Sequence, residues 1–269
     1  MTEKSLSKLM DEALSGQMSQ EDISQAVNQA AGNYYHSPVQ KFEDRLKDIL
    51  VEEALVHLRP GRVLDLGYIN TLWTQALLDR GITHIDIVEG AQTHADNARR
   101  DWGHDPRVRV FHSLFEAFEP DEPYDTILMS GVVKHVPDDK GLVRRARSWL
   151  KPGGVIIAST PNSRAFHRRL GTYMGMELAP DRHNATDRSV FNVHLYDRFS
   201  WRALFVEAGY DVFALKGIVF KILSAEQLMY LSSRYDVDRM IEGLRQLGDE
   251  LQDYAWYLVL AARADEETS

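Results

Sequence analysis

Short apolar segments that alternate with stretches of helical spacing constrain the fold of this 269-residue chain more than any other feature. Strands covered by helices on both faces lose the alternation of apolar and polar residues, and they read as nearly continuous apolar runs. The pattern therefore predicts an α/β fold built on a mostly parallel sheet. In chain order, the segments are "RVLDLG", "HIDIVEG", "RVRVFHS", "YDTILMSG" and "LKPGGVIIASTPN".

The sequence on either side of these segments predicts further elements. Residues 1–58 read as helices: "SQEDISQAVNQAAG" has a Ser cap and a Gly stop, and "SPVQKFEDRLKDILVEEALVHL" repeats apolar residues at helical spacing. We interpret them as an N-terminal lid or dimer element on an α/β domain covering 59–269. Residues 163–205, rich in Arg, His and aromatic side chains, are interpreted as an insertion over the strand ends. Two final strands are predicted at "GYDVFALKGIVFKIL" and "DYAWYLVLAARA", with a helix over about 224–250 between them.

Composition and charge argue against several classes of function. A formal net charge of −9 disfavours a nucleic-acid surface, which needs clustered Lys and Arg. The absence of cysteine excludes disulfides, thiolate zinc sites and a cysteine nucleophile, and the histidine spacing suggests no metal site. The charged N-terminus has no apolar signal core, and the longest apolar stretch, "YAWYLVLAA", is about half a membrane span. We therefore expect a soluble, cytoplasmic protein with no membrane partner.

Four motifs occur in an order and spacing that together indicate one fold family. They are "VLDLG" before a turn and a helix, an acidic strand end at "DIVEG", "YDTILMSGVVKHVPD", and "LKPGGVIIASTPN". With these motifs the chain resembles class I S-adenosylmethionine-dependent methyltransferases of the small-molecule type, well over residues 60 to about 160 and loosely elsewhere. The resemblance implies a Rossmann-like sheet of seven mostly parallel strands, with helices on both faces and an antiparallel hairpin at one edge.

The resemblance also implies a cofactor site after the first two strands. In the family, a loop of the form E/D-x-G-x-G-x-G lets the cofactor lie against bare backbone. Asp65 and Gly67 match this loop, but Ile69 and Thr71 replace the next two glycines. We expect the branched Ile69 to project into the cofactor volume or to force the loop elsewhere, with strain if φ is positive there. The alternative is a reshaped loop that still binds cofactor. The other implied contacts are Glu89 at the ribose hydroxyls and Leu114 and Phe115 beside the adenine. The alternatives are that Glu89 is an inherited carboxylate at a strand end and that Leu114 and Phe115 are ordinary core residues.

The substrate side also departs from the family pattern. Where many relatives read "HVLEHV", this chain reads "GVVKHV", with Gly131 and Lys134 at the His and Glu positions and with His135 kept. A base in place of an acid favours an anion in the pocket, unless Lys134 points to solvent at a helix start.

The insertion and the lid supply further candidates. The insertion holds a cluster of basic and aromatic residues suited to an anionic group, of which two or three arginines are expected to face the site while most are solvated. Tyr34 and Tyr35 in "NYYHSP" fold over the pocket or pack between helices. The candidates are His194 as a base, and Tyr34, Tyr35, Ile69, Arg168, Tyr173 and Tyr196 as substrate contacts.

Two enzymatic hypotheses follow, and the altered loop favours the first. In it, the chain no longer uses S-adenosylmethionine, needs no cofactor, and catalyses a cyclisation or elimination on a small amine carrying an anionic leaving group. The resemblance would then extend to the aziridine-forming proteins of azinomycin-type pathways. Asp65 or Glu89 would hold the amine, and Lys134 and His135 would face the anion. In the second hypothesis, the chain is an S-adenosylmethionine-dependent N- or O-methyltransferase of small molecules, with His135 or His194 as general base.

A third hypothesis is not enzymatic. The chain would be a methyltransferase-like subunit that supports a catalytic partner, with the N-terminal helices as its docking surface. A small-molecule substrate is therefore expected in two hypotheses, and a small protein partner or a homodimer remains open.

Overall fold

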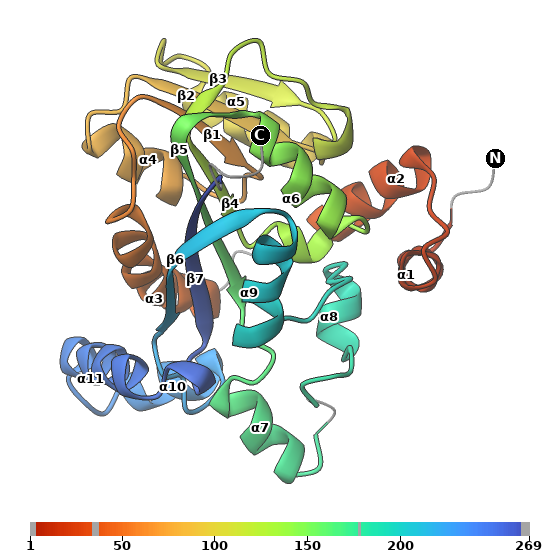
Figure 1. Cartoon of the computed structure of the whole chain (residues 1–269). Coiled ribbons are helices and arrows are strands. Elements are labelled where there is room, and N and C mark those ends of the chain that lie inside the picture. The colour runs from red at the N-terminus through yellow and green to blue at the C-terminus, as the bar shows by residue number, and fades with distance from the viewer. Residues whose placement is uncertain (1–3, 34–37, 177–178, 265–269) are drawn as a thin grey trace.

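The computed structural model describes residues 4–33, 38–176 and 179–264, and a sheet of seven strands lies at its centre (Figure 1). The strand order is β3-β2-β1-β4-β5-β7-β6, with parallel pairing except where β7 pairs antiparallel with β5 and β6. This confirms the predicted fold class, including the antiparallel hairpin at one edge. The strands are β1 (Arg62–Leu66), β2 (His84–Glu89), β3 (Val108–His112), β4 (Tyr124–Ser130), β5 (Leu150–Pro161), β6 (Tyr210–Ile218) and β7 (Tyr257–Ala264).

Helices cover both faces of the sheet, which explains why the strand segments read as continuous apolar runs. Successive residues of a strand point to opposite faces, so Val63 packs in one hydrophobic core and Leu64 in the other. The first core contains side chains of α3 (Pro38–Leu55), α4 (Leu72–Asp79), α5 (Gln92–Trp102), α10 (Ala225–Ser232) and α11 (Val237–Glu250). The second contains side chains of α6 (Asp139–Ser148) and α9 (Arg198–Glu207).

The single helix expected over about 224–250 is two helices, α10 and α11. Each has its own start signal: the Ser224 side chain accepts a hydrogen bond from the backbone of Gln227, and that of Asp236 accepts from Asp238 and Arg239. A side-chain acceptor at this position satisfies backbone N–H groups that have no partner inside the helix, and so favours a new helix start.

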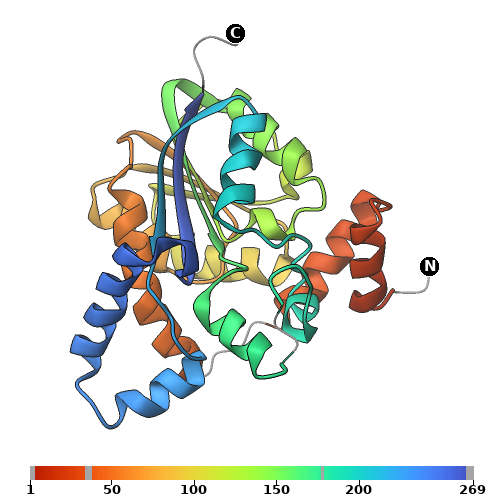
Figure 2. The ribbon, with the colours of Figure 1, turned by 60° about the horizontal axis from the view of Figure 1, so that its bottom comes forward.

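Of the helices in the expected lid, 1–58, α3 packs in the first core, whereas α1 (Leu6–Leu14) and α2 (Gln20–Ala31) stand beside the sheet (Figure 2). These two helices are called the N-terminal lid below. The predicted Ser cap and Gly stop of α2 are confirmed at Ser19 and Gly32. The lid packs through Leu9, Met10 and other apolar side chains against Phe191 and Val193 of the insertion. Two segments far apart in the chain therefore share one small hydrophobic core.

The insertion contributes two short helices, α7 (Phe166–Tyr173) and α8 (Ala185–Ser189). The next helix, α9, begins inside the expected range of 163–205, but its Trp201 is fully buried in the second core. It therefore belongs to the helical layer that covers the sheet.

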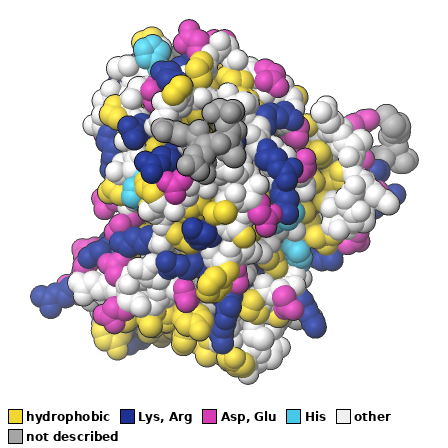
Figure 3. Space-filling model, in the orientation of Figure 1, with side chains coloured by type: hydrophobic (Ala, Val, Ile, Leu, Met, Phe, Trp, Pro, Cys, Tyr) yellow, Lys and Arg dark blue, Asp and Glu magenta, His cyan; other side chains and the backbone are white. Residues whose placement is uncertain are grey.

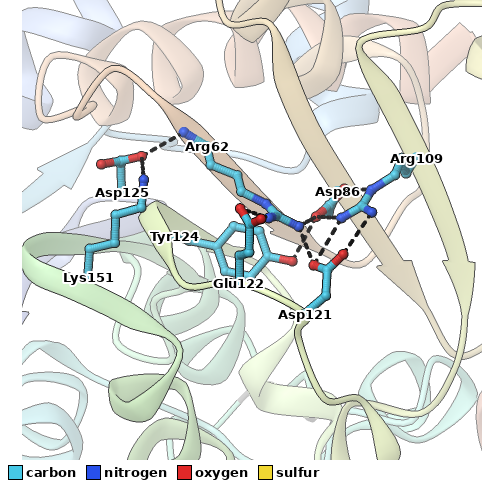
Figure 4. A network of polar contacts seen from close by, with 8 residues as sticks. All are labelled: Arg62, Asp86, Arg109, Asp121, Glu122, Tyr124, Asp125 and Lys151. Atoms are coloured by element: carbon cyan, nitrogen blue, oxygen red, sulfur yellow. Dashed lines mark hydrogen bonds and ion pairs between the residues drawn. The ribbon is translucent and has the colours of Figure 1, made fainter.

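A polar network around the buried Asp86 joins the amino ends of four neighbouring strands (Figure 4). Asp86 of β2 accepts hydrogen bonds from Arg62 Nη2 at 2.9 Å, Arg109 Nε at 2.7 Å and the Tyr124 hydroxyl at 2.8 Å. Burial opposes the charged form, but the hydrogen bonds from Arg109, Arg62 and Tyr124 outweigh it and lower the pKa of Asp86. Both arginines also contact Asp121. This end of the sheet is thus held by compensated charges.

On the face shown in Figure 3, basic and acidic side chains are interspersed, and no single sign of charge dominates. Among the helices in the described ranges, none is long and apolar enough to cross a membrane. The expected lack of a nucleic-acid partner stays a prediction.

Candidate functional site

A cavity of about 510 Å³ lies at the carboxyl ends of the parallel strands. Its walls come from the loops after β1, β2, β3 and β4, from α2 and α3, and from the end of α8. In parallel α/β sheets, ligands bind at this edge, because the strand ends and the helix starts meet there. The polar network of Asp86 lies at the opposite ends of the same strands.

Two carboxyl groups form the acidic side of the cavity. Asp65, the fourth residue of β1, is 3% exposed, and its carboxyl group has no hydrogen bond within the described ranges. Glu89 ends β2 and accepts hydrogen bonds from the backbone N–H groups of Tyr68 at 2.7 Å and Ala91 at 2.6 Å. Burial, followed by the charge of Glu89, raises the pKa of Asp65 to about 8. Burial raises the pKa of Glu89 to about 7, and its backbone hydrogen bonds oppose the shift.

The loop between β1 and α4 has a shape that does not require its missing glycines. Gly67 has a φ of +88°, which suits glycine, and its N–H donates to the carbonyl of Val88 at 2.8 Å. Thr71 has a φ of −74°, and among the described non-glycine residues a positive φ occurs at Phe191 and Val219, not at Ile69. The backbone strain considered for Ile69 is therefore absent. The Ile69 side chain lines the cavity and is 47% exposed. Its contact with a bound ligand stays a prediction.

Tyr68 anchors this loop to α5. Its ring is buried, and its hydroxyl donates to Asp101 at 2.9 Å and accepts from the Trp102 indole N–H at 3.1 Å. The backbone N–H of the same residue donates to Glu89. A side chain buried against the neighbouring helix therefore fixes the loop.

The basic side of the cavity lies on the turn after β4, in the short helix η2 (Val133–His135). Lys134 does not point freely to solvent, because its Nζ lies 2.8 Å from Asn192 Oδ1 and 3.0 Å from His135 Nε2. His135 Nδ1 lies 2.9 Å from the Phe191 carbonyl. Burial lowers the pKa of both residues, that of Lys134 to about 7 and that of His135 well below its ordinary value.

The structure gathers some of the predicted site residues around the cavity and leaves others outside. Leu114 and Phe115, at the short helix η1 (Phe115–Ala117), contribute apolar wall beside the acidic side. Residues that line the cavity are Asp65, Gly67, Ile69, Glu89, Leu114, Phe115, Lys134 and His135.

Four predicted site residues are absent from the cavity wall. Three of them have polar partners elsewhere, and the fourth is exposed. His194 Nε2 lies 3.0 Å from the Val136 carbonyl, and the Tyr196 hydroxyl donates to Asp139 at 2.5 Å. Arg168 pairs with Asp187 at 3.3 Å, and Tyr173 is 79% exposed at the end of α7. These positions give no direct support to substrate roles. Tyr34 and Tyr35 lie outside the described residues.

Sequence reasoning missed several wall residues, and one group of them had a readable signal. Ile23, Val27 and Ala30 of α2 face the cavity, and their spacing of four and three residues marks one face of a helix. Lys47 on α3 also lines the cavity. By contrast, nothing in the sequence around Asn192 connects it with Lys134, because the contact depends on how the insertion folds back.

The acidic side of the cavity fits the cofactor that the family resemblance implies. A buried carboxyl group without a hydrogen-bond partner, facing a cavity, is strongly disfavoured unless a ligand or a proton compensates it. Asp65 is such a group, and Glu89 adds a second acid beside it. S-adenosylmethionine carries a positively charged amine and sulfonium as well as ribose hydroxyls, which these two acids could bind.

Comparisons with known sequences agree with this fit. A family model described as a methyltransferase domain matches residues 39–215. The ubiquinone biosynthesis O-methyltransferase of Pseudomonas entomophila (strain L48) is 30% identical over 109 residues, which cover 40% of this chain and 47% of that protein. The protein of the same name from Pseudomonas putida (strain W619) is 27% identical over 196 residues, covering 71% and 81%. The chain thus spans about half the length of the first relative and most of the second.

Solved structures show the same fold at low sequence identity. A putative methyltransferase in complex with the Haloferax volcanii Trm112 activator has a TM-score of 0.58 at 18% identity, covering 85% of this chain and 94% of that one. The [4+2]-cyclase SpnF has a TM-score of 0.57 at 16% identity, with 98% of both chains covered. A complex of DhpI with SAH has a TM-score of 0.56 at 15% identity, covering 96% and 98%. Because the family model spans more than half of the sequence and the sheet has the matching topology, this chain belongs to the class I methyltransferase-domain family.

Proposed function

We propose that this chain is an S-adenosylmethionine-dependent methyltransferase that acts on a small molecule. The observation that carries the proposal is the pair of buried carboxyl groups, Asp65 and Glu89, that face the cavity beside the Gly67 turn. The curated relatives named above are O-methyltransferases, which supports methyl transfer to oxygen.

The chain's own residues would hold the cofactor on the acidic side of the cavity. Asp65 would bind the ammonium group, because a nearby cation favours its charged form and offsets its burial. Glu89 would accept hydrogen bonds from ribose hydroxyls, and Leu114 and Phe115 would contact the adenine. When bound, S-adenosylmethionine supplies a methyl group on a positively charged sulfur. The protein's contribution is then mainly to exclude water and to align the acceptor with that methyl group.

The preference for an enzyme that has lost this cofactor finds no support in the comparisons, and neither does aziridine formation. It depended on Ile69, and the structure has no strained backbone at that position. What remains is a side chain of moderate size on the cavity wall. SpnF shares the fold at 16% identity, which carries no information about the reaction of this chain.

Calorimetric titration with S-adenosylhomocysteine tests the proposal. We expect micromolar binding by the wild-type protein, and a loss of about 2 kcal/mol, or about 30-fold in affinity, for Asp65→Asn, because the bound ammonium loses its charged partner. Glu52→Gln, which removes an exposed carboxylate of α3 away from the cavity, should bind like the wild type. Absence of any heat or thermal stabilisation at millimolar ligand would reject the proposal and return the cofactor-free enzyme to consideration.

A protein partner or homodimer remains a proposal about the same chain. The Haloferax volcanii methyltransferase above forms a complex with an activator, but that property belongs to that protein. Light scattering during gel filtration, at several concentrations, would show whether this chain is a monomer.

A further inference from the structure

The nitrogen of Lys134 is fixed in position at the cavity wall. Its two neighbours, Asn192 Oδ1 at 2.8 Å and His135 Nε2 at 3.0 Å, both act as acceptors if His135 carries its proton on Nδ1. That tautomer follows from the Phe191 carbonyl, which can only accept, 2.9 Å from Nδ1. An ammonium group has three N–H bonds, so one is left for a ligand in the cavity.

The insertion supports this arrangement from behind. The Asn192 amide nitrogen donates to Asp187 Oδ1 at 3.0 Å, and Asp187 Oδ2 lies 3.3 Å from Arg168 Nη2. Asp187 is buried and also completes the cap of α8. The side chain of Asn192 therefore cannot rotate freely, and its oxygen stays directed at Lys134. A role for Arg168 behind this chain of contacts replaces the direct substrate contact that the sequence suggested.

The charges around Lys134 set its protonation. Burial lowers its pKa most; Asp187 of α8 raises it, and Lys47 of α3 lowers it, with a resulting value of about 7. His135 beside it is held neutral by burial and by the charge of Lys134. At neutral pH the free amine and the ammonium are both populated, which a lysine at its ordinary pKa does not offer.

We propose that Lys134 takes the proton from a phenolic hydroxyl of the acceptor and then pairs, as an ammonium, with the resulting oxyanion. The substrate class is therefore a phenol, a conclusion that rests on the proposed methyltransferase function. In balance, the O–H bond breaks as an N–H bond forms. The oxygen electron pair then forms the new O–CH₃ bond while the S–CH₃ bond breaks, leaving a thioether. Lys134 afterwards releases its proton to water.

The geometry favours a phenol over the other acceptors. An amine acceptor would become a cation beside Lys134 during the transfer, and two like charges at this distance repel. A carboxylic acid is already ionised at neutral pH and needs no base, whereas a phenol with an ordinary pKa near 10 does. A phenol needs a proton acceptor first and a cation beside its oxygen afterwards. Lys134, held at one fixed point, can serve as both in turn.

Absorbance of para-nitrophenol tests the proposal without turnover, because the phenolate form is yellow and the phenol form is not. The probe is titrated with protein at pH 6, with and without S-adenosylhomocysteine, for the wild type, Lys134→Met and Lys47→Met. We expect the bound probe to ionise at least tenfold more readily than the free probe in the wild type. Lys134→Met should lose this shift, and Lys47→Met, which removes the same charge from the same cavity, should keep most of it.

Each other outcome overturns the assignment. Lack of binding at millimolar probe, a bound probe that stays neutral, or an equal shift in Lys134→Met would do so, and tighter Lys134-dependent binding of benzoate would indicate a carboxylate site instead. Circular dichroism checks folding, and Lys134→Gln, which can still donate to Asn192, replaces the Met variant if that does not fold. Binding of S-adenosylhomocysteine with no phenolate shift would refute this inference alone. A shift without such binding would refute the proposed function and the methyl-transfer step, and would leave only the proton transfer to Lys134 supported.

Discussion

Substitution of Asp65 by Asn should stabilise the unliganded protein while it weakens ligand binding. The pKa of Asp65 is raised from 3.8 to about 8, so at pH 7 the folded protein must take up a proton that the unfolded chain does not hold. Over about 3 pH units, at about 1.36 kcal/mol each, this costs about 4 kcal/mol. A buried Asn amide without partners costs about 1–3 kcal/mol of that gain. We expect a net stabilisation of about 2 kcal/mol, or about 4–8 °C in Tm for a protein of this size.

The pH dependence and a matched aspartate make the test sharp. Because the folded-state pKa is the higher one, the wild type loses stability as pH rises from about 4 to about 8, and the advantage of Asp65→Asn should grow over that window and then level off. Asp86 on the neighbouring strand is equally buried, at 3% exposed, but has a lowered pKa and two arginine partners. Asp86→Asn should therefore lose about 3 kcal/mol at pH 7. A lower Tm in both variants, or an effect of Asp65→Asn on Tm that is independent of pH, would refute the reasoning.

Three further perturbations test the loop and the lid. Ile69→Ala should bind S-adenosylhomocysteine about fivefold more tightly by calorimetry, because the smaller side chain relieves about 1 kcal/mol of crowding in the cavity. Glycine is not needed there, since Ile69 has no positive φ. Weaker binding would show that Ile69 is a favourable contact. Tyr68→Phe leaves the Trp102 N–H without its acceptor and should lower the free energy of unfolding in urea by about 1–3 kcal/mol, whereas an unchanged midpoint would mean that water replaces the hydroxyl. Phe191→Ala removes the central side chain of the lid core, at about 3 kcal/mol, and should speed hydrogen exchange in α1 and α2 but not in the sheet; uniform acceleration would contradict a separately packed lid.

The sheet could be predicted from the apolar strand segments, whereas Asp65 and Glu89 were predicted as cofactor contacts from the family resemblance, and the fold gives a physical reason for where they lie. Strands buried on both faces must be apolar throughout, so a charged residue near their carboxyl end, such as Asp65 or Glu89, stands out. Parallel strands place all such ends at one edge, so two acids far apart in sequence had to be close in space.

The basic side was only partly predictable, because it depends on an insertion without regular periodicity. His194 and Tyr196 lie two residues apart and near the right strands, yet their polar atoms turn to Val136 and Asp139 beneath the turn after β4. Asn192, two residues earlier, contacts Lys134 instead. The backbone changes direction at Phe191, which has a φ of 55°, and this turn determines which side chains reach Lys134. No propensity favours that conformation for phenylalanine.

The two ends of the same strands differ in whether their buried ionisable groups have partners that stabilise the charged form. At the amino ends, Asp86 is surrounded by donors, and its charged form is stabilised without any ligand. At the carboxyl ends, Asp65 is as buried as Asp86, but its pKa is raised. The pKa of Lys134, which lines the same cavity, is lowered, so each group is driven toward its neutral form. Stability alone would not select either, since an apolar residue of similar size would pack at least as well. A cation beside Asp65 and an oxyanion beside Lys134 would each restore the charge that folding suppresses. An electrophilic methyl donor and an ionisable acceptor, bound together, are a pair of ligands that meets both requirements.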